Sequence, residues 1–139
     1  MPVIINRIIE RTTSDTDIID ITSKVVSNLE KSEVVNGTVN LFVPGSTAAL
    51  TTIEFESGAV NDLRKAISRI APREDYYEHN ERWGDGNGYS HVRAALVGPS
   101  LSVPVINSNL SLGTWQQIVL LDFDNRARER NIIQQIFGI

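Results

Sequence analysis

Several short stretches of the chain alternate apolar with polar residues, and this spacing of two is typical of β-strands. Residues 3–12 are rich in β-branched side chains, and Ile53 and Phe55 alternate with polar neighbours within residues 49–56. Five further stretches have strand-like composition: 38–43, 89–97, 101–106, 114–123 and 131–137. The later strands are joined by short connections of proline, asparagine and aspartate, which favour antiparallel pairing.

Two other segments show the spacing of three to four residues that is typical of an amphipathic helix. The first follows Thr22, a candidate N-cap, and ends near Lys31; the second follows Ser57 and ends before Pro72. Their apolar positions are Val25, Val26 and Leu29 in the first, and Val60, Leu63, Ile67 and Ile70 in the second. The pattern predicts one α+β domain over residues 1–139, in which a mostly antiparallel sheet of six to eight strands is layered with two helices.

Composition narrows the class of protein. The 139 residues are 41% hydrophobic and 22% charged, which is enough apolar material for one core. The chain has no cysteine, no apolar run of membrane length and no signal-like start, so we expect a cytoplasmic protein without a membrane partner. The net charge of −4 argues against a nucleic-acid partner. We interpret the one dense basic run, residues 126–130, as a solvated turn or a subunit contact.

The strongest candidate chemistry surrounds a long polar connection, residues 73–88. The chain has two histidines, His79 and His91, and they flank a segment in which glycine occupies every second position from 84 to 88. A connection of this length inside a compact domain is usually functional or disordered, and its aromatic residues favour order. If residues 89–97 form a strand, His91 and Arg93 share one face and could hold an anionic group. The alternative is a histidine satisfied by hydrogen bonds at a sheet surface.

Other polar residues could complete a site, and each has an ordinary structural alternative. Asp85 and Asn87 offer an acceptor and an amide beside the glycines, or they serve the backbone of a turn. Ser46 and Thr47 could bind phosphate oxygens, or they form a tight turn. Glu54 could act as a base or ligand, or it is a solvated charge.

The segment 113–117 contributes Gln116 as a candidate substrate-binding residue, whereas its neighbour Trp115 is predicted to be a core residue rather than a stacking platform. No serine lies in a nucleophile-elbow sequence, so a serine triad is disfavoured. Two histidines without cysteine supply half of a tetrahedral zinc site, and carboxylates or water would have to supply the rest.

Taken together, several motifs resemble the YjbQ-like family in order and spacing. They are Gly37–Leu50, Tyr77–Asn80, Gly86–His91, Leu112–Gln117, Leu121–Asp124, Arg126 and Arg128. The resemblance extends from about Asp20 to Gly138. It implies an α+β fold with antiparallel sheet, a homotrimer with a pocket at subunit boundaries and, for some members, a thiamin phosphate synthase activity. That reaction joins a pyrimidine methyl pyrophosphate to a thiazole phosphate and releases pyrophosphate.

One position departs from the family pattern. Many relatives have His-Thr-Thr-Ala-Ala in the first motif, and this chain has Gly45 at the position of the histidine. A cluster of three histidines is therefore excluded. The glycine could instead open room for a ligand beside Ser46 and Thr47.

These observations support an enzyme that acts on a small phosphorylated or anionic heterocycle. The candidate catalytic residues are His79, His91, Asp85 and Glu54, and the candidate substrate-binding residues are Ser46, Thr47, Asn87, Arg93 and Gln116. His79 and His91 are also the candidate ligands of a divalent cation, Mg²⁺ or Zn²⁺. The rival hypotheses are a non-catalytic trimer that binds a small anion or metal ion, and a structural trimer without a ligand.

Overall fold

The computed structural model describes residues 2–14 and 16–139, which form eight strands and four helices. The strands are β1 (Val3–Arg11), β2 (Asp17–Asp20), β3 (Gly37–Phe42), β4 (Ala48–Glu54), β5 (Ser100–Ile106), β6 (Asn109–Leu110), β7 (Gln116–Asp122) and β8 (Glu129–Gly138). The helices are α1 (Thr22–Ser32), α2 (Ser57–Ile70), α3 (Glu78–Trp83) and α4 (Gly88–Val97). The α+β class and the antiparallel sheet predicted from the sequence are confirmed.

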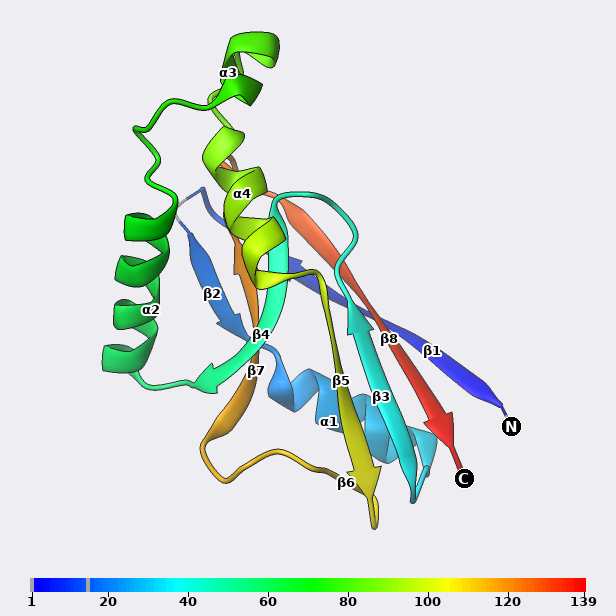
Figure 1. Cartoon of the computed structure of the whole chain (residues 1–139). Coiled ribbons are helices and arrows are strands. Elements are labelled where there is room, and N and C mark those ends of the chain that lie inside the picture. The colour runs from blue at the N-terminus through cyan, green and yellow to red at the C-terminus, as the bar shows by residue number, and fades with distance from the viewer. Residues whose placement is uncertain (1, 15) are drawn as a thin grey trace.

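The strands form two antiparallel sheets (Figure 1). The larger, sheet A, has the order β1-β8-β3-β5-β6, and the smaller, sheet B, has the order β2-β7-β4. The longest pairing joins β1 to β8 in continuous register, from Val3 opposite Phe137 to Arg11 opposite Glu129. In sheet A, β8 lies between β1 and β3, and in sheet B, β7 lies between β2 and β4.

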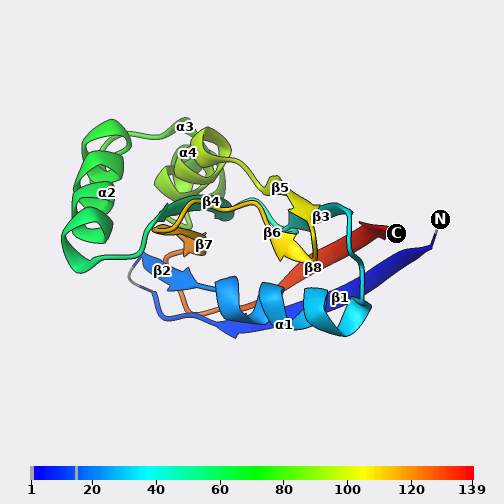
Figure 2. The ribbon, with the colours of Figure 1, turned by 90° about the horizontal axis from the view of Figure 1, so that it is seen from below.

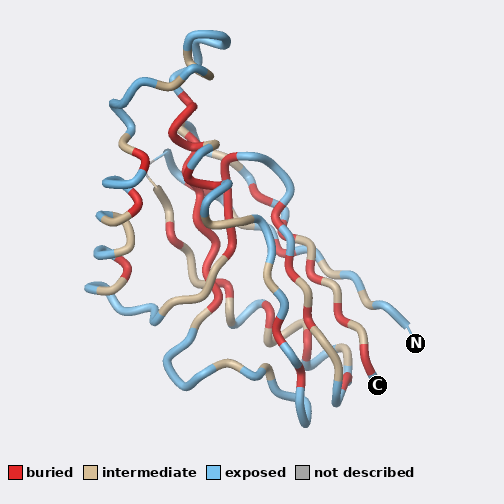
Figure 3. Tube along the Cα trace, in the orientation of Figure 1, coloured by how far each residue is buried: buried red, intermediate tan, exposed pale blue. Residues whose placement is uncertain are grey.

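Two apolar clusters hold the layers together. One lies between sheet A, α1 and the inner face of sheet B, and it includes Val39, Leu120 and Ile136. The other lies where α2 and α4 cover the opposite face of sheet B, and it includes Val119 and Phe123. Figure 2 shows α1 along β1 and β8, with α2 and α4 beyond β4. Strand β7 is therefore buried on both faces, which explains its unbroken apolar run (Figure 3).

The prediction of a strand over residues 89–97 was wrong, because this segment is helix α4. Its buried residues Tyr89, Ser90, Arg93 and Ala94 follow helical spacing, while Val92 and Leu96 are exposed. The alternation of Val92, Ala94 and Leu96 therefore did not mark a buried sheet face. Another helix, α3, forms inside the polar connection, so the described residues form four helices rather than the two predicted.

Smaller differences concern caps and exposure. Glu56, not Ser57, caps α2, because its carboxylate accepts hydrogen bonds from the N–H groups of Gly58 and Ala59. Thr22 lies inside α1, where its hydroxyl accepts a hydrogen bond from the N–H of Ile118. Trp115 is 72% exposed, so its predicted place in the core was wrong. None of the helices in residues 2–14 and 16–139 is long and apolar enough to cross a membrane.

Candidate functional site

His79 and His91 lie side by side, one on α3 and the other on α4. Their ring centroids are 4.4 Å apart, with the ring planes tilted by 47°. Asp85, in the loop between the two helices, brings its Oδ1 to 3.4 Å from Nδ1 of His79. We call His79, His91 and Asp85 the histidine site. The pair that the sequence placed on either side of a glycine-rich loop thus meets in space.

The histidine site borders a hollow of about 480 Å³ whose wall includes Tyr76, Tyr77 and Val92. The side chain of His79 is 31% exposed and that of Asp85 is 48% exposed, so solvent reaches both. Nδ1 of His79 makes no formed hydrogen bond within the described residues, since its 3.4 Å approach to Asp85 is long and poorly aligned. Catalytic hydrogen bonds are often loose without substrate and shorten when it binds.

The glycines of the loop have conformational roles. Gly84 ends α3 in the left-handed region, and its N–H donates to the carbonyl of Asn80 at 2.8 Å. Gly88 is needed for close packing, because a Cβ there would lie 2.5 Å from Cβ of Tyr77. The backbone N–H of Gly88 also donates to Oδ1 of Asn80 at 2.9 Å. These contacts fix α3 against the start of α4, and they thereby set the distance between the two histidines.

Asp85 and Asn87 play different parts. Oδ1 of Asp85 accepts the N–H of Asn87 at 3.1 Å, which is the turn expected of such a segment, and the same carboxylate faces His79. Asn87 is buried, and its Oδ1 accepts the N–H of Asn125 at 3.2 Å. The amide of Asn87 therefore anchors the loop, whereas Asp85 is exposed and lies beside His79.

Behind the loop lies a buried network of polar residues, which we define as Thr47, Asp122, Asp124 and Arg130. Arg130 donates from Nε to Oδ2 of Asp122 at 2.8 Å and from Nη2 to Oδ1 at 2.9 Å, a bidentate pair. Thr47 connects the two carboxylates, because its hydroxyl accepts from Arg130 at 2.6 Å and donates to Asp124 at 3.0 Å. All four residues are at most 8% exposed.

Asp124 joins this network to the loop. Its Oδ2 accepts Nε of Arg128 at 3.1 Å and lies 3.4 Å from Nδ2 of Asn87. Burial acts to raise the pKa of Asp124, but hydrogen bonds from Thr47, Arg128 and the N–H of Arg126 outweigh it, so the pKa is lowered overall. Asp124 is therefore held as a carboxylate that positions Asn87 at the start of α4.

Sequence reasoning missed the role of this network. Residues 126–130 were interpreted as a solvated turn or a subunit contact, but Arg130 is buried and paired inside the chain. The charges lie close in the sequence, because Asp122 ends β7, Asp124 follows it, and Arg128 and Arg130 lie near the start of β8. The two strands belong to different sheets, so no strand-pairing pattern in the sequence indicates the ion pair.

Arg93 does not accompany His91. The prediction that they share a face was wrong, because residues two apart on a helix lie on different sides. The guanidinium of Arg93 is buried against the rings of Tyr89 and Phe123, and its Nε donates to the carbonyl of Ala71 at 2.9 Å. Arg93 therefore ties the end of α2 to α4 and is not placed to bind a ligand beside His91.

The remaining candidates are spread over the chain. Ser46 is exposed in the β3–β4 loop, and Thr47 belongs to the buried network. Gly45 has a φ of +113°, and a Cβ there would lie 3.0 Å from Nη1 of Arg130, so this position lies beside the network. Glu54 and Gln116 are paired at the far end of β4, about 20 Å from Ala48 at its start. Within one chain the structure does not bring them to the histidines.

A resident metal is not supported by the donors of one chain. Among residues 2–14 and 16–139, no three or more histidine and carboxylate side chains are grouped so that they could hold a metal ion. His79 and His91 with Asp85 supply two imidazoles and a nearby carboxylate. The arrangement is one of acid–base groups at an open hollow.

The fold and the site define a class of α+β protein. Its members have two antiparallel sheets and a partly exposed pair of histidines. The family model described as "UPF0047 protein YjbQ-like" matches residues 6–139, and the chain belongs to this family. A UPF0047 protein of Methanothermobacter thermautotrophicus is 40% identical over 128 residues, covering 92% of this chain and 87% of that protein. The YugU protein of Bacillus subtilis is 34% identical over 129 residues, covering 92% and 95%.

Solved structures agree with the fold. The crystal structure of a YbjQ-like protein of unknown function from Sulfolobus solfataricus has a TM-score of 0.94 at 33% identity and covers 99% of both chains. A hypothetical protein from Aeropyrum pernix has a TM-score of 0.90 at 30% identity, covering 97% of this chain and 98% of that one. The family resemblance inferred from the motifs is thus confirmed. The names of these relatives and solved structures state no activity.

Proposed function

We propose that the protein is an enzyme that acts on a small anionic heterocycle and uses the histidine site for proton transfer. The observation that carries the proposal is the meeting of His79 and His91 at a hollow walled by two tyrosines, with the Asp85 carboxylate beside His79. Two adjacent imidazoles can donate and accept protons, and a carboxylate beside one of them fixes its orientation. Tyr76 and Tyr77 offer aromatic surface for a heterocyclic ring.

The reaction we favour is the coupling that the family resemblance suggests. The thiazole nitrogen forms a bond to the pyrimidine methylene carbon, the bond from that carbon to pyrophosphate breaks, and the leaving group takes up a proton. His91 or His79 would supply that proton, and Asp85 would orient His79. Any Mg²⁺ would arrive with the pyrophosphate as part of the substrate, since the described residues offer no cation cage of their own.

Direct assay of the coupling tests this reaction. Purified protein with both thiamin precursors and Mg²⁺ should form thiamin phosphate, and His91→Ala should lower the rate by about 10²-fold or more, the range of general acid–base catalysis. Asn61→Ala, at an exposed position on α2, is the control and should retain the wild-type rate. A product rate equal in wild type and His91→Ala would rule out the proposal.

The second candidate is a binding protein without turnover, and the openness of the hollow favours it, because catalysis usually excludes water. Native mass spectrometry of the untagged protein distinguishes the two. An anion that is retained by the wild type, lost from His91→Ala and chemically unchanged would support binding.

We also propose a homotrimer that packs through the outer face of sheet A. Val3, Ile5 and Ile9 of β1 are each more than half exposed, and their pairing register places Phe137 and Gln135 of β8 on the same face. Apolar surface of this kind on an antiparallel sheet is typical of an interface. Light scattering should give three times the chain mass, and Ile5→Lys should dissociate the assembly. A wild-type monomer at all concentrations would contradict the proposal.

A further inference from the structure

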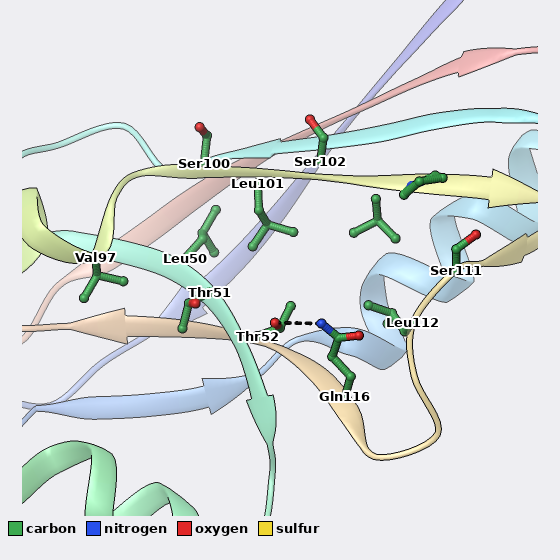
Figure 4. Close-up of a pocket in the computed structure, with 12 residues that line it drawn as sticks. Leu50, Thr51, Thr52, Val97, Ser100, Leu101, Ser102, Ser111, Leu112 and Gln116 are labelled. Atoms are coloured by element: carbon green, nitrogen blue, oxygen red, sulfur yellow. Dashed lines mark hydrogen bonds between the residues drawn. The ribbon is translucent and has the colours of Figure 1, made fainter. Parts of the chain in front are cut away.

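A second hollow lies between the two sheets, where β4 and β5 diverge (Figure 4). It has a volume of about 370 Å³, and none of the residues that line it is ionisable. Val97 at the end of α4 lines this cleft, whereas His91 lines the histidine hollow, and six residues of helix separate their Cα atoms by about 9 Å. The cleft is thus a separate cavity with a different chemical character.

We propose that this cleft binds an uncharged, planar heterocycle that presents an N–H donor beside a carbonyl acceptor. The proposal rests on unused hydrogen-bonding groups along two strand edges and on the apolar side chains between them. It does not depend on the reaction proposed for the histidine site.

The edge of β5 that faces the cleft can be identified from one contact. The carbonyl of Pro104 accepts the N–H of Ser111 at 2.9 Å, so the polar groups of Pro104 point away from β3. Backbone groups two residues apart on a strand point the same way. The N–H and carbonyl of Ser102 therefore also face away from β3, toward the cleft, and this edge is where a proline can occupy a strand without breaking the ladder.

The edge of β4 follows from the same reasoning. Leu50 donates its N–H to the carbonyl of Gly98 at 3.0 Å, so the groups of Leu50 and, two residues on, of Thr52 face β5 rather than β7. Across the part of the chain that the structure describes, no backbone group pairs with the N–H or carbonyl of Thr52 or Ser102 on this side. Both edges thus offer a donor and an acceptor to a ligand.

Side chains shape the space between the edges. Figure 4 shows Leu101 and Leu112 pointing into the cleft, while Ser102 points away from it. At the wide end, Gln116 is held by its Nε2 on Thr52 Oγ1 at 2.9 Å and by its Oε1 on the N–H of Gly113 at 3.0 Å. A flat ring would pack its faces against leucine and its edge against the strands.

The size and closure of the cleft exclude an inserted β-strand. The contact between Leu50 and Gly98 closes the narrow end, and the segment from Ser111 to Gln116 closes the other. An added strand would need an open gap several residues long. A compact neutral molecule fits, and the lack of ionisable groups disfavours a charged one.

Uracil is the probe that tests the proposal, with 1,3-dimethyluracil as its matched control. In the full-length, ¹⁵N-labelled protein, millimolar uracil should shift the amide signals of Ser102 and Thr52. Dimethyluracil lacks both N–H donors, so it should bind at least about ten-fold more weakly. Binding should be equal at about pH 6 and about pH 8, because no ionisable residue lines the cleft.

A pair of variants at one position isolates the strand edge. Ser102→Pro removes the N–H that faces the cleft, in the same orientation as the natural Pro104, and it should abolish the uracil response. Ser102→Ala keeps that N–H and loses only the exposed hydrogen bond to Asn40, so its response should equal that of the wild type. Should Ser102→Pro not fold, Leu101→Trp, which fills the cleft, provides the same comparison.

Four results would overturn the proposal. The first three are an absence of shifts with uracil, equal binding of uracil and dimethyluracil, and a uracil response that survives in a folded Ser102→Pro or Leu101→Trp protein. The fourth is a set of shifts confined to His79 and His91, which would assign the ligand to the other hollow.

Discussion

The histidine site and the buried network meet at Asn87, but similar polar groups are partly exposed in the first and buried and hydrogen-bonded in the second. In the network, Asp122 and Arg130 are nearly inaccessible and form a bidentate ion pair with further hydrogen bonds. In the histidine site, the side chains of His79 and Asp85 are 31% and 48% exposed, while Nδ1 of His79 is itself buried and has no formed hydrogen bond. Satisfied, buried charge fixes structure, whereas partly exposed side chains are free to meet a substrate.

The largest expected effect comes from breaking the network. Asp122→Ala leaves the Arg130 guanidinium buried without its carboxylate, and we expect a loss of about 3–5 kcal/mol in the free energy of unfolding. Chemical denaturation of the purified variant measures it. The control is Arg11→Ala, which breaks an ion pair with Glu129 at the surface and should cost about 0–0.5 kcal/mol. Similar losses in the two variants would mean that the network does not stabilise the fold.

The second effect tests how the two regions are joined. Gly88→Ala places a Cβ 2.5 Å from Cβ of Tyr77, so α3 must shift away from α4 at a cost of about 1–3 kcal/mol. The same shift should separate His79 from His91 and weaken ligand binding. Gly113→Ala is the matched control, because its nearest side-chain atom would be 3.7 Å away. If Gly88→Ala bound and unfolded like wild type, the packing of α3 on α4 would not position the histidines.

Acid titration provides a third, smaller test. Because the folded-state pKa of Asp124 is lowered, its contribution to stability is complete above its unfolded value of about 3.9. That contribution is lost as the pH falls through the folded-state pKa. Asp124→Asn removes this proton uptake, so stability below about pH 4 should fall less steeply, by at most about 1.4 kcal/mol per pH unit. Unfolding curves at several acidic pH values measure the slope, and unchanged slopes would contradict the assignment.

The same contrast explains what could be predicted from the sequence. Strand β7 and helix α2 were found because their apolar spacing is local and their apolar faces are buried as the spacing requires. Helix α4 was missed because its buried face contains Ser90 and Arg93. Their partners are the carbonyl groups of Phe123 and Ala71, which lie 33 and 22 residues away in the sequence. A polar residue buried by a distant partner leaves no periodic signal.

The site was predicted in the same uneven way. The proximity of the two histidines and Asp85 follows from one short loop that contains Asp85 and joins the two helices, and their role as a site stays a prediction. Thr47 was proposed as a phosphate ligand, but it bonds to Asp124 across 77 positions of sequence, and no local pattern indicates such a contact. Local motifs therefore indicate which residues come together in the histidine site, and tertiary structure decides which other polar residues lie near it.

The smallest effect on stability should come from the histidine site itself. His79→Ala and His91→Ala remove partly exposed side chains, and no formed hydrogen bond of Nδ1 is lost with His79, so each should change stability by less than about 1 kcal/mol. Each should nevertheless lower activity or ligand retention. Melting temperature and ligand binding, measured on the same preparation, separate the two effects. If either variant loses stability on the scale of Asp122→Ala while the remaining folded protein binds normally, the histidines belong with the structural residues. The comparison would then fail, because the accessible region would be stabilising the fold in the way that the buried network does.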